Sequence, residues 1–219
     1  MLPFKTIAFD LDGTIADTAP DLAAALNAAL VSLGREPVSP NTVRSLIGHG
    51  TRAMLSEGLA VTGGSDEALV EAGYPVLMRY YEAHICDFTR GHPGVTDAFD
   101  ALAAQGIALA VCTNKPSALT LRLIEALGWT HRFAAIVCGD TLSVSKPDPT
   151  PLHLAIECAG GGRAAFVGDS SVDVATGKAA GVPSIAVSFG FADKPPHELG
   201  ADRVIDAYSG LFGALATLA

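Results

Sequence analysis

Cysteine is scarce in this sequence, and its four cysteines, Cys86, Cys112, Cys138 and Cys158, form no CxxC pair. We therefore expect no disulfide framework and no thiolate zinc site, and we assign Cys112 and Cys138, which lie in apolar runs, to the core. No apolar stretch approaches the roughly 18 residues that a membrane-spanning helix needs. The N-terminus enters a predicted strand almost at once, which leaves no room for a signal peptide, so the expected compartment is the cytoplasm.

Positive charge is also in short supply, since 14 Lys and Arg residues face 23 Asp and Glu residues in a net charge of −9. Binding along a phosphate backbone requires a basic face, so we expect no nucleic-acid partner, and likewise no membrane partner. A chain of 219 residues, 49% of them hydrophobic, can bury a core without help from a disulfide or a structural metal. Whether the protein is a monomer or a homodimer stays open.

Short apolar runs alternate with helix-period segments along most of the chain. Runs that are apolar throughout, without alternation, are typical of parallel strands covered by helices on both faces. The pattern predicts an α/β fold with a doubly wound parallel sheet, in which ligands bind at the C-terminal ends of the strands. The predicted strands are Thr6–Phe9, Ile107–Cys112, Ala135–Cys138, Ala164–Val167, Ser184–Val187 and Arg203–Ile205.

The alternation stops between about residues 18 and 90, where four helical stripes occur without a convincing strand. Pro75 lies inside the last stripe and is expected to kink or split that helix. We therefore predict an α/β core domain of residues 1–17 and 91–219, and an all-helical insertion of residues 18–90. Because the insertion follows the first strand, we expect it to act as a lid over the C-terminal end of that strand.

Polar residues stand at the ends of several predicted strands. FDLDGTIAD places Asp10 and Asp12 at the end of the first strand, on one face of it, where their charges repel. A divalent cation would relieve that repulsion. Other polar residues stand at the end of the second strand, after the fourth strand, and within the SKPDP segment between them: Thr113 and Asn114, Asp169 and Asp173, and Lys146, respectively.

Because the ends of parallel strands meet in one crevice, we expect the four carboxylates, the hydroxyl and the ammonium to form a single site. Carboxylates with little His or Cys nearby favour Mg²⁺ over zinc or copper. A carboxylate beside Mg²⁺ can attack phosphorus, while Thr113 and Lys146 hold the phosphoryl oxygens and Gly13 lets backbone amides approach. Each residue alone has a simpler interpretation as a helix cap or a surface residue, but together they indicate a catalytic site.

In this order, the motifs resemble those of the haloacid-dehalogenase-like hydrolases: DLDGT at residues 10–14, Thr113, SKPDP with Lys146, and GDSSVD with Asp169 and Asp173. The resemblance covers the whole chain. It implies that Asp10 is a nucleophile that becomes an aspartyl phosphate, and that Asp12 is first the general acid and then the base. It also implies that Asp10, the backbone carbonyl of Asp12 and Asp169 bind Mg²⁺, with Asp173 supporting them from behind.

Within this family, the chain is most similar to phosphoglycolate phosphatases, through the segments FDLDGTIADT, IGHG and HPGV. This similarity implies a small phosphorylated metabolite as the partner, namely 2-phosphoglycolate, although His49 stands where relatives often carry Asn. Arg52 is a second candidate for substrate binding in the insertion. If Thr51 caps the next helix, a cation in its first turn opposes the helix dipole, whereas a guanidinium suits a substrate carboxylate.

Other functions stay open at this point. A phosphatase of another small metabolite, such as a sugar phosphate, or a phosphosugar mutase like β-phosphoglucomutase would keep every motif of the core. A haloacid dehalogenase usually lacks the second acid, so Asp12 argues against it. A phosphate-receiver signalling module has a shorter chain without a helical insertion. The glycines of Gly160–Gly162 lack the spacing of a dinucleotide-binding fingerprint and are expected to form a loop.

Overall fold

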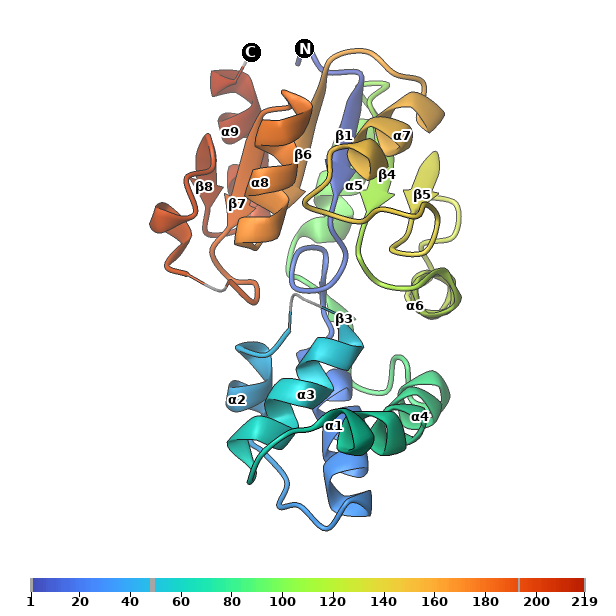
Figure 1. Cartoon of the computed structure of the whole chain (residues 1–219). Coiled ribbons are helices and arrows are strands. Elements are labelled where there is room, and N and C mark those ends of the chain that lie inside the picture. The colour runs from blue at the N-terminus through green and yellow to red at the C-terminus, as the bar shows by residue number, and fades with distance from the viewer. Residues whose placement is uncertain (1, 48–49, 193, 219) are drawn as a thin grey trace. The chain divides into compact units, whose positions relative to one another are not determined.

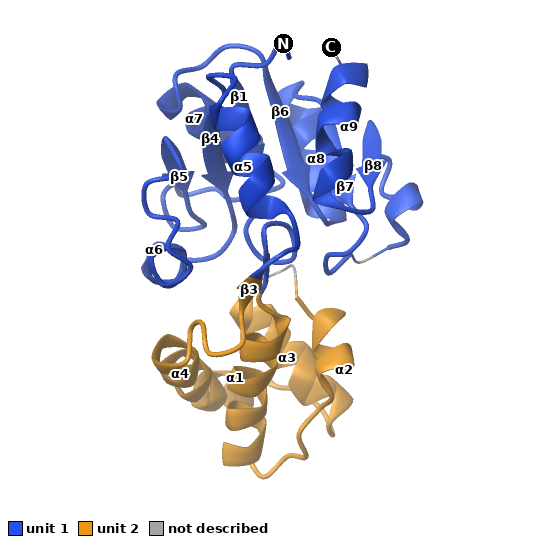
Figure 2. Cartoon of the chain, turned by 180° about the vertical axis from the view of Figure 1, so that it is seen from behind, with its two compact units in different colours: residues 1–17, 91–219 blue, residues 18–90 orange. Residues whose placement is uncertain are grey.

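The structure, a computed structural model, describes residues 2–47, 50–192 and 194–218. The chain forms two compact units (Figure 2): unit 1 consists of Met1–Asp17 and Gly91–Ala219, and unit 2 of Thr18–Arg90. Among the described residues, no helix is long and apolar enough to cross a membrane.

Unit 1 is built on a six-stranded sheet with the strand order β5-β4-β1-β6-β7-β8, in which each pair of neighbours is parallel. The prediction of a doubly wound α/β fold is therefore confirmed. The strands agree with the predicted ones to within one residue at each end: β1 (Thr6–Phe9), β4 (Ala108–Cys112), β5 (Ala135–Val137), β6 (Ala164–Gly168), β7 (Ser184–Val187) and β8 (Arg203–Ile205). A separate pair, β2 (Ala16–Asp17) and β3 (Arg90–Gly91), is too short to be recognised by periodicity.

Helices cover both faces of the sheet (Figures 1 and 2). On one face, α7 (Thr150–Cys158) packs beside α8 (Ser171–Ala180), and Leu152 and Ile156 of α7 join a core cluster with Phe166 of β6. On the other face, α5 (Val95–Ala103) places Phe99 edge-on to Phe9, with 5.5 Å between the ring centroids. The remaining helices of this unit are α6 (Ser117–Ala126), α9 (Leu211–Thr217) and the 3-10 turns η1 (Pro196–Glu198) and η2 (Tyr208–Gly210).

The position of β1 decides where the polar strand ends meet. β1 lies between β4 and β6, and Phe9 pairs in register with Val111 of β4 and Val167 of β6. Since the three strands run parallel, the residues that follow them come out at the same edge of the sheet. This edge brings together segments that are about a hundred and more residues apart in the sequence.

The residues of unit 2 that the structure describes form four helices: α1 (Ala19–Ser32), α2 (Pro40–Arg44), α3 (Thr51–Val61) and α4 (Glu67–Ala83). α1 packs against the other three, and α3 also packs on α4. Of the expected kink or split at Pro75, the split does not occur, because α4 continues through this residue as one helix. The missing hydrogen bond of the proline is offset by burial of Val70, Leu77 and Tyr81 on both sides of it.

A buried carboxylate joins the beginning of unit 2 to its end. Asp21 in the first turn of α1 accepts hydrogen bonds from the backbone N–H groups of Phe88 and Thr89, and from the Thr89 hydroxyl at 2.7 Å. Charge-assisted bonds to a buried carboxylate are among the stronger polar contacts in proteins. The two ends of the helical insertion are therefore tied to each other inside unit 2.

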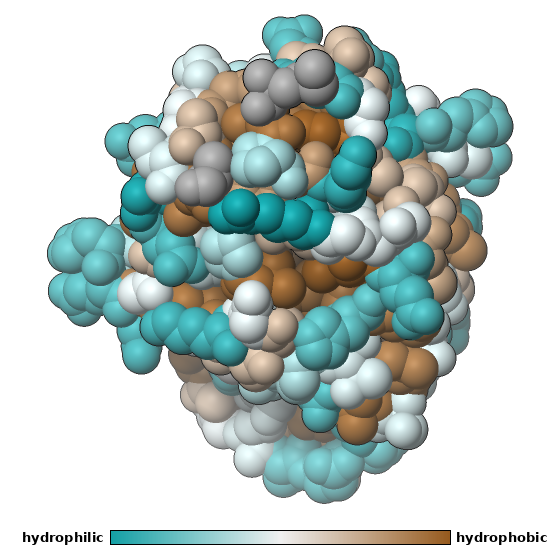
Figure 3. Space-filling model, turned by 90° about the horizontal axis from the view of Figure 1, so that it is seen from above, coloured by the Kyte–Doolittle hydropathy of each residue, from teal (hydrophilic) through white to brown (hydrophobic). Residues whose placement is uncertain are grey.

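Apolar side chains at the surface are scattered rather than collected on one element. Figure 3, which looks onto the end of unit 1 where the chain termini lie, shows hydrophilic and hydrophobic side chains interspersed on that face. The large exposed apolar residues come from separate segments of both units: Val31, Val61, Phe88, Leu121, Val144 and Val204. Single exposed apolar residues are ordinary and indicate no particular partner.

Candidate active site

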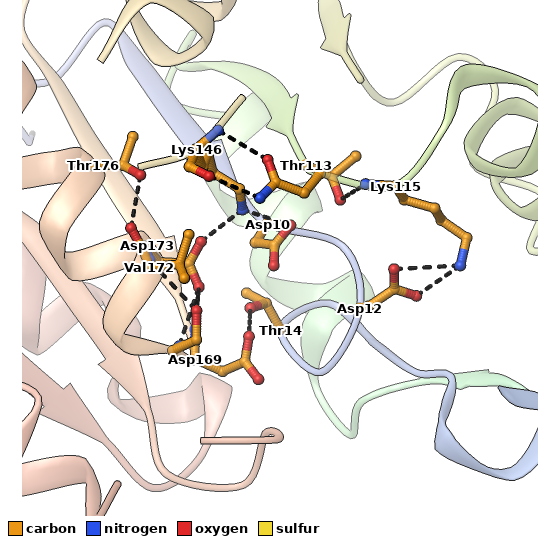
Figure 4. A network of polar contacts seen from close by, with 12 residues as sticks. Asp10, Asp12, Thr14, Thr113, Lys115, Lys146, Asp169, Val172, Asp173 and Thr176 are labelled. Atoms are coloured by element: carbon orange, nitrogen blue, oxygen red, sulfur yellow. Dashed lines mark hydrogen bonds and ion pairs between the residues drawn. The ribbon is translucent and has the colours of Figure 1, made fainter. Parts of the chain in front are cut away.

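Asp10 is the first residue after β1, and its backbone N–H donates to the carbonyl of Val167 at 2.9 Å. Its carboxylate lies 2.9 Å from the ammonium of Lys146 (Figure 4). Burial raises the pKa of Asp10 from 3.8 to about 6, and the neighbouring carboxylates of Asp173 and Asp12 add to this, although Lys146 opposes it. The strand end therefore holds a carboxylate whose negative charge is incompletely neutralised by the protein.

Lys146 lies between two carboxylates. Its Nζ is 2.9 Å from Oδ1 of Asp10 and 2.6 Å from Oδ1 of Asp173, and only 3% of its side chain is exposed. Burial by itself lowers the pKa of this ammonium, but the attraction of Asp10 and Asp173 outweighs burial and raises the pKa above its ordinary value. Lys146 is therefore a permanently charged group at the centre of the cluster.

Asp169 follows β6 and uses both of its carboxylate oxygens. Oδ1 accepts the hydroxyl of Thr14 at 2.8 Å, and Oδ2 accepts the backbone N–H of Phe191 at 2.6 Å. Burial, together with the charges of Asp173 and Asp10, raises the pKa of Asp169 well above 3.8. Gly13, at φ +78°, passes so close that a Cβ there would lie 2.4 Å from Oδ2 of Asp169, so a glycine is required at this position.

Asp173 belongs to the N-terminus of α8. Its Oδ2 accepts the Ser170 hydroxyl at 2.6 Å and the backbone N–H groups of Asp169 and Ser170, which completes a capping box. Its Oδ1 is paired with Lys146. Asp173 therefore links the helix terminus to the buried ammonium, and both of its oxygens already have protein partners.

The cluster suits a hard divalent cation. Asp10, Asp169 and Asp173 each offer a carboxylate oxygen, and these atoms all lie within 4.8 Å of one another. Burial, and after it the repulsion of the neighbouring carboxylates, raises the pKa of Asp10 and of Asp169, which is the situation that a bound cation relieves. An all-oxygen set of this kind fits Mg²⁺.

Asp12 lies in the loop after β1 and is paired with a lysine that the sequence analysis did not select. The Nζ of Lys115 is 3.0 Å from Oδ1 and 3.3 Å from Oδ2 of Asp12 (Figure 4). The side chain of Lys115 is 3% exposed and that of Asp12 is 17% exposed. A signal was available, because Lys115 stands two residues after Thr113, just as Asp12 stands two residues after Asp10.

Thr113 and Asn114 organise the end of β4. The buried Thr113 accepts the backbone N–H of Lys115 with its hydroxyl at 3.2 Å. Both ends of the Asn114 amide bind the backbone of Lys146, at 3.0 Å and 2.9 Å. The sequence analysis placed Asn114 among the groups that bind the substrate, whereas this geometry assigns it to the positioning of Lys146.

Of the two candidates in the helical insertion, His49 lies outside the described residues. Arg52 pairs with Glu67 at 2.6 Å and with Glu71, and its guanidinium lies over the ring of Tyr74, 5.5 Å from the centroid. The helix α3 is capped by Gly50, and Thr51 is its first residue instead of its cap. The expected cap at Thr51 is therefore wrong, and the guanidinium of Arg52 has two carboxylates and an aromatic face of α4 as partners, while its binding of a substrate stays a prediction.

A C-terminal residue also supports the loop after β1. The buried hydroxyl of Tyr208 donates to the carbonyl of Thr14 at 2.9 Å, and the hydroxyl of Thr14 in turn donates to Asp169. Tyr208 and Phe191 come from segments without a recognisable motif, so the sequence carries no signal for these two contacts. The tertiary fold alone brings them to the cluster.

Comparison with known proteins assigns the chain to a family. Residues 7–187 match the model of the family described as haloacid dehalogenase-like hydrolase. A phosphoglycolate phosphatase of Agrobacterium fabrum is 42% identical over 210 residues, which cover 94% of this chain and 90% of that protein. A phosphoglycolate phosphatase of Mesorhizobium japonicum is 42% identical over 213 residues, 96% of this chain and 94% of that protein.

Solved structures agree with this assignment. The crystal structure of a predicted phosphoglycolate phosphatase from Haemophilus somnus superposes with a TM-score of 0.90 at 29% identity, covering 97% of this chain and 98% of the other. The predictions of this family and of a hydrolytic enzyme are confirmed. The chain belongs to the haloacid dehalogenase-like hydrolases.

Proposed function

We propose that this protein is a Mg²⁺-dependent phosphatase that hydrolyses 2-phosphoglycolate to glycolate and phosphate through an aspartyl phosphate on Asp10. The observation that carries the proposal is the cluster at the edge of the parallel sheet, where carboxylate oxygens of Asp10, Asp169 and Asp173 lie within 4.8 Å of one another and Lys146 pairs with Asp10 and Asp173. The substrate is proposed from the relatives, which are named phosphoglycolate phosphatases and which match this chain over 90% and 94% of their own length.

In the first step, an oxygen of Asp10 attacks phosphorus and the bond from phosphorus to the ester oxygen breaks. Lys146, fixed beside Asp10, neutralises charge on the phosphoryl oxygens while the phosphoryl group is transferred to the Asp10 carboxylate. Asp12 donates a proton to the departing alkoxide of glycolate. The products of this step are glycolate and a phosphorylated Asp10.

In the second step, a water molecule attacks the phosphorus of phospho-Asp10. Asp12, which lost its proton in the first step, accepts a proton from that water, and the bond between Asp10 and phosphorus breaks. Asp10 returns as a carboxylate and phosphate leaves. Thr113, held at the end of β4, is the hydroxyl proposed to orient the phosphoryl group.

Asp10, Asp169 and the backbone carbonyl of Asp12 are the groups proposed to hold Mg²⁺, with Asp173 behind them. When bound, the cation lowers the repulsion between Asp10 and an anionic phosphate. Asp173 is assigned the supporting place because its Oδ1 is neutralised by the ammonium of Lys146 and its Oδ2 caps α8, whereas both partners of Asp169 are uncharged. The helical residues 18–90 are proposed to be the cap domain of such an enzyme.

The decisive experiment is Asp10→Asn, with purified protein, Mg²⁺ and 2-phosphoglycolate. We expect loss of nearly all phosphate release, because an amide does not attack phosphorus. In the wild-type protein, intact-mass analysis or borohydride trapping should find one phosphoryl group on Asp10 during turnover. Asp97→Asn, the same change at an exposed carboxylate of α5, should leave the rate unchanged.

Several outcomes would overturn the proposal. A fully active Asp10→Asn enzyme would exclude Asp10 as the nucleophile, and an undiminished rate in excess EDTA would exclude the metal. Phosphate release from a sugar phosphate but not from 2-phosphoglycolate would replace the substrate. Interconversion of sugar phosphates without net phosphate release would instead indicate a mutase.

A further inference from the structure

Lys115 is the charged group of the site that the proposed two-step reaction leaves unused. Its ammonium approaches both oxygens of Asp12, at 3.0 and 3.3 Å, while Lys146 serves Asp10 and Asp173. Figure 4 shows these as two separate groups of contacts, with Lys115 reaching Asp12 from the end of β4. The question is what a second buried ammonium does beside the proposed acid–base residue.

The backbone of Lys115 is anchored on both sides. Its N–H donates to the hydroxyl of Thr113, and its carbonyl accepts the N–H of Gly139 at 3.0 Å and the hydroxyl of Thr120 at 3.3 Å. Gly139 comes so near that a Cβ there would lie 2.2 Å from the carbonyl oxygen of Asn114. The ammonium is therefore presented from a fixed loop, which lowers the entropy lost when it binds an anion.

Charge and reach both fit a carboxylate of the substrate. The four aspartates and two lysines of Figure 4 leave two negative charges in excess, which one divalent cation would neutralise. Asp12 in the protonated form that the proposed first step requires no longer needs the charge of Lys115, so this ammonium can pair with a substrate carboxylate. In 2-phosphoglycolate, one methylene separates the ester oxygen from the carboxyl carbon, which puts a carboxylate oxygen about 3 Å from the ester oxygen. A group held at hydrogen-bond distance from Asp12 is thus within reach of that carboxylate when Asp12 faces the ester oxygen.

We infer that Lys115 is the specificity residue that binds the carboxylate of a short phosphorylated hydroxy acid, exchanging Asp12 for the substrate when the latter enters. This inference rests on the proposed function, because it takes Asp12 as the residue that faces the leaving oxygen. In the absence of substrate, the pair with Asp12 keeps the buried ammonium compensated. When the substrate carboxylate takes over Lys115, the side chain of Asp12 becomes free to turn to the ester oxygen.

Arg52 offers a weaker alternative for the same role. Its guanidinium is already engaged by Glu67, Glu71 and the ring of Tyr74, all within unit 2. A substrate carboxylate would have to displace two carboxylates there, whereas at Lys115 it displaces one. If Arg52 bound the substrate carboxylate instead of Lys115, the Lys115 variants described next would keep the preference for 2-phosphoglycolate over ethyl phosphate.

The test compares two substrates that differ only in the carboxylate, 2-phosphoglycolate and ethyl phosphate. Lys115→Met and Lys115→Gln remove the charge, and Lys178→Met makes the same change at an exposed lysine of α8 as the control. We expect Lys115→Met to lower the ratio of kcat/KM for 2-phosphoglycolate to that for ethyl phosphate by about 10- to 100-fold, the worth of a hydrogen bond to a charged group. Lys115→Arg should recover part of the ratio, and Lys178→Met should leave it unchanged.

A binding measurement removes the dependence on turnover. In the Asp10→Asn background, calorimetry should show that Lys115→Gln weakens binding of 2-phosphoglycolate by a similar factor while binding of ethyl phosphate changes little. An unchanged ratio in both assays, with equal losses on the two substrates, would overturn the inference and leave Lys115 as a positioning residue for Asp12. Wild-type protein that does not hydrolyse 2-phosphoglycolate at all would instead overturn the proposed function, and the inference with it.

Discussion

Asn114 holds Lys146 by its main chain: the side-chain amide donates to the Lys146 carbonyl at 3.0 Å, and its oxygen accepts the Lys146 N–H at 2.9 Å. The residue at the end of β4 thereby fixes a loop that is 32 positions away in the sequence. The ammonium of Lys146 reaches Asp10 and Asp173 from that fixed backbone. The position from which the ammonium of Lys146 meets the two carboxylates is therefore set by the amide of Asn114, which contacts the Lys146 backbone and not its ammonium.

The first prediction concerns this clamp. Asn114→Ala should lower kcat for 2-phosphoglycolate by about 10- to 100-fold, because a displaced Lys146 no longer holds the phosphoryl oxygens in position for attack by Asp10. Asn27 is a matched control, since its amide makes the same two bonds to the backbone of Val38, at 2.9 and 2.8 Å, within unit 2. Asn27→Ala should lower the melting temperature but not kcat. Equal kcat losses in both variants would show that general destabilisation is responsible.

The second prediction concerns the support of Asp169 by the C-terminal segment. Tyr208→Phe removes the bond to the carbonyl of Thr14. Because Thr14 also holds Asp169, we expect a several-fold weaker Mg²⁺ affinity by calorimetry, besides a loss of about 1 kcal/mol in the free energy of unfolding. Tyr81→Phe makes the same change at a buried tyrosine of unit 2 and should leave Mg²⁺ affinity as it is. Unaltered Mg²⁺ affinity in Tyr208→Phe would restrict this residue to stability.

The third prediction is a pH dependence of the metal-free protein. The pKa of Asp10 is about 6 in the folded state against an ordinary value of 3.8, so between these pH values the folded state binds more protons at this residue. The free energy of unfolding should therefore fall as pH rises from about 4 to 6, by up to about 3 kcal/mol from Asp10. Urea titrations in EDTA should show this fall in the wild-type protein.

The comparison with Asp10→Asn isolates that contribution, because the variant has no carboxyl group to titrate at this position. The difference in stability between the variant and the wild type should grow in favour of the variant from pH 4 to 6. Saturating Mg²⁺ should abolish the trend, since the cation stabilises the ionised carboxylate of the folded state. A difference that stays constant with pH would contradict the raised pKa.

The fourth prediction concerns Arg52. A double-mutant cycle of Arg52→Ala and Glu71→Ala should reveal a favourable coupling in the melting temperature, because the two side chains form an ion pair in unit 2. The coupling should shrink in high salt, since both side chains are largely exposed. A marked rise in KM for 2-phosphoglycolate in Arg52→Ala, without any coupling to Glu71, would instead assign the guanidinium to the substrate.

The sequence determined the sheet and the acidic part of the site. Apolar runs such as Thr6–Phe9 and Ser184–Val187 can only be buried on both faces, so they specify parallel strands under helices, and the structure has them with the same bounds. Asp10, Asp169 and Lys146 were also predictable, because their positions after strands and before a proline place them at one edge of such a sheet. These inferences need only local pattern and the geometry of parallel strands.

Only the tertiary structure decided which partner each polar group takes. The amide of Asn114 turns to Lys146, Lys115 turns to Asp12, and Arg52 turns to Glu67 and Glu71. Each of these contacts joins residues at least fifteen positions apart, across elements whose spacing and rotation no local pattern encodes. The sequence pattern predicts which polar groups follow a strand, but the direction of each side chain depends on the neighbours that tertiary packing brings to it.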